Sequence, residues 1–201
     1  MRESLRVSQN TLEAAKNKAA CYHLPMQDLY EFTVPVFIKM LGGLKSVLSK
    51  AEAFAREKGI SEEAFLNQAL APDMFPLKKQ VQVASDHAKG AAARLSGIEV
   101  PSYEDSEATF AELQARIDKT IEFLRTVSKE SFAEAGTRKV SLAYWKGKSL
   151  NGFDYAREYA ISNFFFHVTT AYGIIRHAGV SVGKSDYING LSFENLEAEV
   201  E

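Results

Sequence analysis

Residues 154–179, DYAREYAISNFFFHVTTAYGIIRHAG, decide the fold of this chain. Apolar side chains cover much of the circumference of a helix here, and no proline interrupts them. This pattern predicts a long helix at the centre of the domain. The same stretch holds His167 next to three phenylalanines. An imidazole in such surroundings needs a hydrogen-bonding partner, a buried neighbour or a metal ion.

Three further segments show the helical period. They cover residues 34–58, residues 76–97 and a third helix that we expect to be capped by Asp105 or Ser106. The apolar stripe of the third is formed by Phe110, Leu113, Ile117, Ile121 and Leu124. Four long amphipathic helices in one chain predict an all-α four-helix bundle.

The ends and interior of the first long helix carry their own signals. Thr33 is a candidate N-cap, and Gly59 supplies a left-handed stop. Gly42 and Gly43 in the interior each cost about 1 kcal/mol of helix propensity relative to alanine. We therefore expect a neighbouring backbone to approach the helix closely at this pair.

Two connections between the long helices contain structure of their own. Ser61 opens a short extra helix that we expect to end at Pro72. Residues 138–153 lose the helical period, and KVSLAYW and KSLNGF read as two short strands around Gly147, which supplies a positive φ in the turn. The bundle should therefore carry a small β-hairpin just before its last helix.

Length and cysteine content indicate one domain in a reducing compartment. A chain of 201 residues fits a single core. We expect a loosely ordered extension over residues 1–25, a bundle domain over residues 26–192 and a frayed acidic tail over residues 193–201. The lone Cys21 excludes an internal disulfide, which favours a cytoplasmic location.

Charge and hydropathy exclude two classes of partner. The chain has 24 Lys and Arg against 26 Asp and Glu, scattered along its length, and so lacks the clustered basic face of a nucleic-acid-binding protein. We see no apolar run of the roughly 20 residues that a transmembrane helix needs. We expect neither nucleic acid nor membrane as a partner.

Two histidines on different helices are the candidate functional residues. On a helix, residues three, four or seven apart share a face, which places His87 with Gln80 and Arg94, and His167 with Asn163. Small side chains flank both imidazoles: Ala84, Ala91, Ala160 and Ala171. Small neighbours leave room beside the rings, so we expect a small pocket between the two helices.

Two blocks of the sequence carry a family resemblance. They are LAPDMFPLKKQVQVASDHAKGAAARLSGIEVPSYEDSEATFAEL and NFFFHVTTAYGIIRHAGVSVGKSDYING. Over residues 27–190 the chain resembles a domain-of-unknown-function family within the DinB/YfiT-like superfamily. The resemblance implies a four-helix bundle, often a homodimer. Many superfamily members bind a divalent metal, and some are glutathione-, mycothiol- or bacillithiol-dependent transferases or isomerases.

The resemblance also maps a metal site onto this chain. His87 corresponds to the ligand on the second helix, and His167 to the second histidine of an HxxxH pair on the last helix. Asn163 replaces the first histidine of that pair. Catalytic zinc sites keep three protein ligands plus water, and an amide oxygen is a poor substitute for imidazole. We therefore expect a degenerate site, with Zn, Ni or Mn held weakly if at all.

Two interpretations of the histidines stay open at this point. In the first, His87, Asn163 and His167 line a pocket for a small molecule or ion, with Gln80 and Tyr172 as further ligand-binding candidates; the catalytic residues and the reaction are unknown. In the second, the chain is a non-catalytic dimeric interaction bundle, and the histidines only form hydrogen bonds inside its core.

Overall fold

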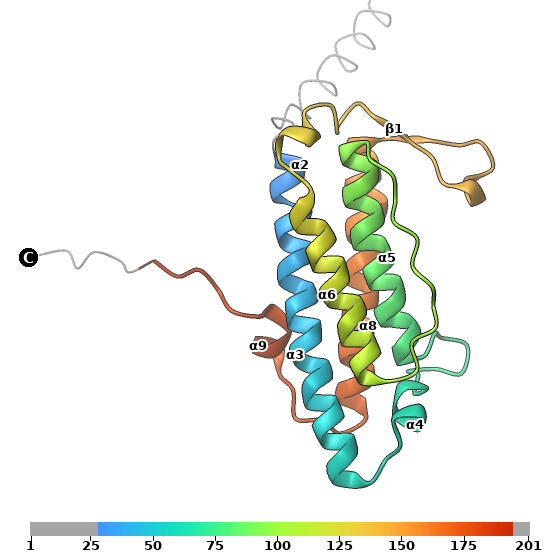
Figure 1. Cartoon of the computed structure of the whole chain (residues 1–201), viewed down its shortest axis with the longest axis vertical. Helices are drawn as coiled ribbons and strands as arrows, with labels where there is room; N and C mark the ends of the chain where they lie inside the picture. The colour runs from blue at the N-terminus through green and yellow to red at the C-terminus, as the bar shows by residue number, and fades with distance from the viewer. Residues whose placement is uncertain (1–27, 195–201) are drawn as a thin grey trace, which may run out of the picture.

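The fold is a bundle of four long helices, α3 (Val34–Lys58), α5 (Leu77–Ser96), α6 (Phe110–Thr126) and α8 (Ile161–His177). The computed structural model describes residues 28–194. The four helices run side by side along the longest axis of the molecule, with α8 behind α5 and α6 in the view of Figure 1. The all-α bundle predicted from the sequence is confirmed.

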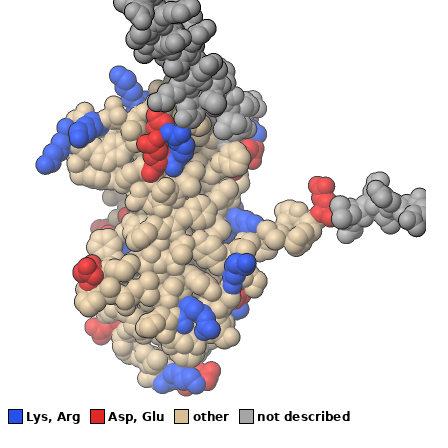
Figure 2. Space-filling model, turned by 180° about the vertical axis from the view of Figure 1, so that it is seen from behind, with Lys and Arg blue, Asp and Glu red and all other residues tan. Residues whose placement is uncertain are grey.

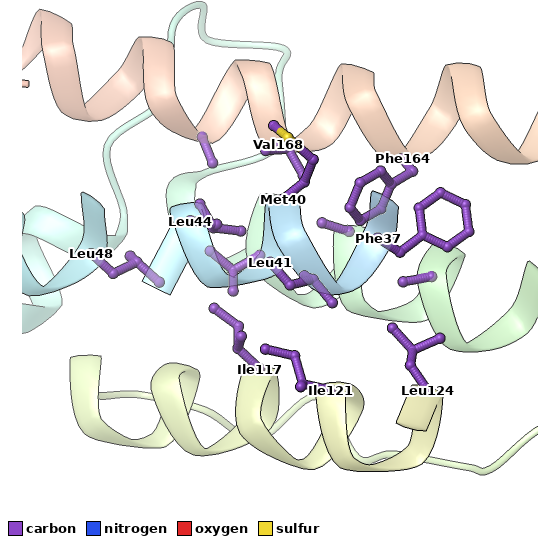
Figure 3. Packing of buried hydrophobic residues seen from close by; sticks show 14 of the residues in the cluster. Phe37, Met40, Leu41, Leu44, Leu48, Ile117, Ile121, Leu124, Phe164 and Val168 are labelled. Atoms are coloured by element: carbon purple, nitrogen blue, oxygen red, sulfur yellow. The ribbon is translucent and has the colours of Figure 1, made fainter. Parts of the chain in front are cut away.

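The core lies between the four long helices, and Figure 3 shows part of it between α3, α6 and α8. Phe37, Met40, Leu41, Leu44 and Leu48 of α3 point toward the neighbouring helices (Figure 3). The facing side chains are Ile117, Ile121 and Leu124 of α6, and Phe164 and Val168 of α8. All of these residues are buried, as their helical spacing predicts. Burial of side chains of this size contributes about 1.5–3 kcal/mol each and is the main stabilising term of the bundle.

Helix ends follow the sequence signals in part. Gly59 ends α3 with a φ of 66°, as predicted. Thr33 is not a side-chain cap; its hydroxyl donates to the carbonyl oxygen of Tyr30 in the preceding short helix α2 (Asp28–Glu31). The cap of α6 is Thr109, in a reciprocal capping box with Glu112.

The expectation that Asp105 or Ser106 caps α6 was therefore wrong. Asp105 lies before the helix begins and forms ion pairs with Lys79 and Arg116 instead. Long-range pairing of this kind leaves no mark in the local sequence pattern. The connection from α5 to α6 thus stays extended for longer than a capping rule applied to Asp105 would suggest.

The short extra helix and the hairpin are both present, but they are shorter than predicted. Ser61 caps α4 (Glu62–Leu66) by accepting from the backbone N–H of Ala64, and α4 ends well before Pro72. The strands β1 (Lys139–Val140) and β2 (Leu150–Asn151) pair antiparallel. A 3₁₀ turn, η2 (Ala143–Trp145), and Gly147 with a φ of 83° complete the hairpin.

The last long helix is divided into three parts. A short turn α7 (Gly152–Asp154) leads into a π-helical segment η3 (Tyr155–Ala160), which continues as α8. The three consecutive phenylalanines of α8 do not all enter the core. Phe164 is buried, but Phe166 is 55% exposed, because residues two apart point to different sides of a helix.

The glycine pair in α3 permits close packing of the short helix α9 (Lys184–Ile188). A Cβ atom at Gly43 would lie 2.9 Å from the carbonyl oxygen of Tyr187. A Cβ atom at Gly42 would meet only the side-chain amide of Asn189, at 3.0 Å. The predicted close approach of a neighbouring backbone is confirmed at Gly43.

One apolar helical span among the described residues bears on the expectation that no segment spans a membrane. The 30-residue span Leu29–Lys58 is long and apolar enough, by length and composition, to cross a membrane. Half of this span's most apolar window is buried inside the bundle. An apolar helix is also what the centre of a soluble bundle requires, so this signal is weak.

The predicted boundaries of the domain lie largely outside the described part of the chain. The extension over residues 1–25 and the end of the acidic tail fall in the ranges 1–27 and 195–201, which the structure does not describe. Described structure covers residues 28–194, within and just beyond the predicted domain of residues 26–192.

Candidate functional site

Gln80 holds the imidazole ring of His167. Nδ1 of His167 lies 2.7 Å from Oε1 of Gln80. The Gln80 amide donates from Nε2 to the carbonyl oxygen of Phe75 at 2.9 Å, so its Oε1 acts as the acceptor. Nδ1 of His167 is therefore the protonated nitrogen. A neutral His167 then keeps its lone pair on Nε2.

His87 stacks against His167 across the contact between α5 and α8. The ring centroids are 5.6 Å apart and the ring planes are within 13° of parallel. The ring of Tyr159, from η3, lies 5.5 Å from that of His87. The structure thus brings together the two histidines that the sequence singled out on separate helices.

Both imidazoles favour the neutral form. Burial, followed by the neighbouring His167, lowers the pKa of His87 from 6.5 to about 4. Asp86 acts in the opposite direction but less strongly. Burial also lowers the pKa of His167. At neutral pH both rings can therefore accept a hydrogen bond or bind an ion through a lone pair.

Asn163 is placed beside the site but is engaged with its own helix. Its Nδ2 donates to the carbonyl oxygen of Tyr159 at 2.7 Å. Within residues 28–194 no three His, Cys, Asp or Glu side chains form a metal-binding group. The donor set therefore does not fit a tightly held three-ligand metal ion, and no reaction step is assigned to one.

Two predicted site residues have different surroundings. Gln80 is at the site, as the residue that orients His167. Tyr172 is not brought to the histidines: its hydroxyl donates to the carbonyl oxygen of Val182 at 3.4 Å, and its ring packs edge-on against Tyr187. Tyr172 therefore holds the segment after α8.

A separate cluster of charges lies on the α6 side of α5. Asp86 pairs with the buried Arg116, which also pairs with Asp105 and Glu107. A surface cavity of about 450 Å³ is lined by this same region, including Arg116 and Tyr103. Neither His87 nor His167 lines it. This cluster fastens the connection before α6 onto the bundle.

Sequence reasoning missed Tyr159 as a site residue. Tyr159 contacts His87, and its carbonyl oxygen accepts from Asn163. Eight residues before His167 correspond to about 80° around an α-helix, so α-helical counting does not place Tyr159 on the face of His167. Tyr159 lies instead in the π-helical segment η3. π-helical turns occur often at functional sites, and they have no reliable sequence signal.

Comparisons with known proteins agree with this architecture. Residues 29–188 match the family described as domain of unknown function (DUF1993). A crystal structure of a DinB family member protein from Shewanella denitrificans is similar, with a TM-score of 0.82 and 45% sequence identity. The match covers 85% of this chain and 97% of that chain. No curated protein matches the chain.

Proposed function

Because this chain belongs to the DUF1993 family and has a DinB-like fold, we propose that it binds a small molecule between α5 and α8. His87, Asn163 and His167 line the binding pocket. A divalent ion such as Zn, Ni or Mn binds there weakly, through the two imidazoles, with water or ligand atoms completing its coordination.

The observation that carries this proposal is the pairing of two neutral imidazoles from different helices, one of them oriented by Gln80. A histidine with a purely structural role in a core needs one hydrogen-bonding partner, and Gln80 supplies that partner to Nδ1 of His167. The fixed tautomer leaves Nε2 of His167 as an acceptor. Orientation of one ring nitrogen by a second residue is also how proteins prepare a histidine to bind an ion or accept a proton.

Ion binding is tested by thermal unfolding of untagged protein with Zn, Ni or Mn. We expect at least one ion to raise the Tm, and His87→Gln and His167→Gln to abolish the effect. His177→Gln is the matched control, because His177 is exposed at the far end of α8. Equal stabilisation of His167→Gln and the wild type would place the ion elsewhere and remove the metal part of the proposal.

Small-molecule binding is tested separately by ligand-detected NMR with a fragment library. Fragments that bind the wild type and His177→Gln, but not His167→Gln, support the pocket. If every fragment that binds the wild type also binds His167→Gln, the pocket between α5 and α8 is refuted. This readout requires no metal, so it stays informative if the ion experiment is negative.

A second candidate function is a non-catalytic bundle that associates through its surface. Phe75 and Phe166 are 53% and 55% exposed, and Leu70, at 45%, lies beside Gly173 of α8. Figure 2 shows the face of the bundle opposite to that in Figure 1, and the middle of that face carries few Lys, Arg, Asp or Glu side chains. Exposed apolar side chains and a face with few charges are both typical of an interaction surface.

The second candidate predicts a homodimer. Light scattering after gel filtration should then give twice the chain mass for the wild type, and Phe75→Ser with Phe166→Ser should give a monomer. A wild-type monomer at all accessible concentrations would exclude it.

A further inference from the structure

Arg94 of α5 is a half-buried arginine with no carboxylate partner among the described residues. Its Nη1 lies 3.4 Å from the hydroxyl oxygen of Tyr155. The guanidinium folds back over Gly90, where a Cβ atom would lie only 2.3 Å from Nη1. Gly90 therefore leaves the space that Arg94 occupies on the face of α5 that also carries His87.

The contrast with Arg116 shows how this chain treats a buried cation that belongs to its scaffold. Arg116 is paired with Asp86, Asp105 and Glu107. Guanidinium offers five N–H donors in a planar fork that matches a carboxylate. Among the described residues, the guanidinium of Arg94 forms one hydrogen bond, a long one of 3.4 Å to the hydroxyl oxygen of Tyr155. A fork left open in this way is suited to an anionic group from outside the described chain.

An aromatic cluster extends from Tyr155, the hydrogen-bonding partner of Arg94. Tyr155 and Tyr159 of η3 stack with centroids 5.7 Å apart, and Trp145 of the hairpin meets them edge-on at 6.3 Å and 5.2 Å. The hydroxyl groups of Tyr144 and Tyr159 are hydrogen-bonded to each other. Rings supplied by both the hairpin and η3 can pack against a flat apolar body, and their hydroxyl groups can bind its polar end.

The protonation states suit an anion. Burial raises the pKa of Tyr155, and burial together with Tyr144 raises that of Tyr159, so both phenols remain O–H donors at neutral pH. His87 lies against Tyr159 and connects this cluster to the histidine pair. Contacts from Arg94 to Tyr155, from Tyr155 to Tyr159 and from Tyr159 to His87 thus link the arginine to the imidazoles.

We propose that Arg94, Tyr155, Tyr159 and Trp145 form an anion-binding end of the pocket, which receives the carboxylate of a small aromatic acid. The carboxylate pairs with the guanidinium fork, and the ring of the acid packs against Trp145 and Tyr159. This inference deepens the proposed function by naming the class of ligand, and it rests on a pocket being present between α5 and the last helix.

Trp145 is the only tryptophan of the chain, so its fluorescence reports on this site alone. We expect benzoate to change the emission of Trp145 in a saturable manner, and benzamide, its neutral counterpart, to bind about tenfold more weakly or worse. Inorganic phosphate should bind weakly, because it lacks the ring. An equal response to benzamide and benzoate, a stronger response to phosphate, or no saturable response to benzoate would overturn the proposal.

Three variants locate the effect. Arg94→Met should weaken benzoate binding about tenfold or more, and Arg94→Lys should fall between it and the wild type. Gly90→Ala keeps the charge of Arg94 but displaces its guanidinium, so it should weaken binding as well. Alanine has a higher helix propensity than glycine, so this variant provides the test if Arg94→Met fails to fold. Arg138→Met is the matched control, because Arg138 donates to the carbonyl oxygen of Leu95 outside the cluster.

The outcomes separate this inference from the proposed function. Unchanged affinity in both Arg94→Met and Gly90→Ala refutes the anion site, even if ions still stabilise the protein through His167. Loss of benzoate binding in these variants supports the anion site, even if no divalent ion raises the Tm. Weakening by Arg138→Met to the same degree would show a general charge effect and would overturn the assignment to Arg94.

Discussion

Gln80 and His167 form a hydrogen bond, 2.7 Å from Oε1 to Nδ1, that joins positions 87 residues apart in the sequence. The bond sets the tautomer of His167 and the orientation of its ring, against which His87 stacks. Burial of both rings favours their neutral forms. Stability at acid pH and the chemistry of the pocket therefore depend on the same pair of side chains.

The histidine pair should make the protein less stable as the pH falls. The pKa of His87 is about 4 in the folded state and near 6.5 when unfolded, so the unfolded chain binds the extra proton between these values. Stability from this group is complete above pH 6.5 and is lost as the pH falls toward 4. Between pH 7 and pH 5 the loss is about 2 kcal/mol.

Urea denaturation of the wild type and His87→Gln at pH 7 and pH 5 measures this loss. Carboxyl groups titrate in both proteins, so the difference between them isolates His87. The wild type should lose about 2 kcal/mol more than the variant over this interval. Parallel losses in the two proteins would mean that His87 has the same pKa folded and unfolded.

Replacing Gln80 with Met should destabilise the protein by about 1–3 kcal/mol, because it leaves the Nδ1–H of His167 and the carbonyl oxygen of Phe75 without their partner. Chemical denaturation measures this cost. The ¹⁵N shifts of the imidazole measure the tautomer: the wild type should have Nδ1 protonated, and the variant should show a mixture. A wild-type ring protonated at Nε2 would contradict the assignment of donor and acceptor.

The fold could be predicted because its signals are local. Gly59 and Gly97 end helices with positive φ, and Gly147 turns the hairpin, each by a backbone conformation that few other residues adopt. The cap of α6 was misassigned for the opposite reason. Asp105 is a good local cap, but its distant partners Lys79 and Arg116 determine its position.

The site could be predicted only in outline. Helical periodicity placed His87 and His167 on inward faces, and packing of α5 against α8 then brought them together. The partner of Asn163 could not be inferred. One extra residue in a π-helical turn rotates the residues before it by about 100° relative to α8, so spacing counted on an α-helix misplaces Tyr155 and Tyr159.

Gly43 should tolerate no side chain, unlike its neighbour Gly42. A Cβ atom at Gly43 would lie 2.9 Å from the carbonyl oxygen of Tyr187 and 3.2 Å from that of Asp186. These are backbone atoms, which cannot move away by a change of side-chain rotamer. We expect Gly43→Ala to destabilise the protein by about 1–3 kcal/mol through displacement of α9. Gly42→Ala should be neutral or stabilising by up to about 1 kcal/mol, because only a side-chain amide must move.

Chemical denaturation of the two glycine variants tests this contrast under identical conditions. Both substitutions gain the same helix propensity, so their difference reports the contact with α9 alone. Hydrogen exchange should also become faster in residues 184–188 of Gly43→Ala, with the bundle helices unchanged. Equal stability of the two variants would show that α9 does not pack on α3 as described.

Removal of the buried cation Arg116 should lower the free energy of unfolding more than removal of an exposed cation. Its side chain is 2% exposed and pairs with Asp86, Asp105 and Glu107. Arg116→Leu leaves three carboxylates close together without their shared cation, which should cost about 3 kcal/mol at pH 7. Lys45→Leu, which breaks the exposed pair with Asp118, should cost less than about 1 kcal/mol.

The pH dependence of the Arg116 variant distinguishes loss of charge from loss of packing. The pKa of Asp105 is lowered in the folded protein despite its burial, by its hydrogen bond to Lys79 and by the charges of Lys79 and Arg116. Stability from that carboxylate is present above its unfolded pKa and is lost as the pH falls through the folded value. In Arg116→Leu the carboxylates accept protons more readily, so the stability difference from the wild type should shrink from pH 7 to pH 4. A difference that stays constant over this range would mean that Arg116 stabilises the bundle by packing alone.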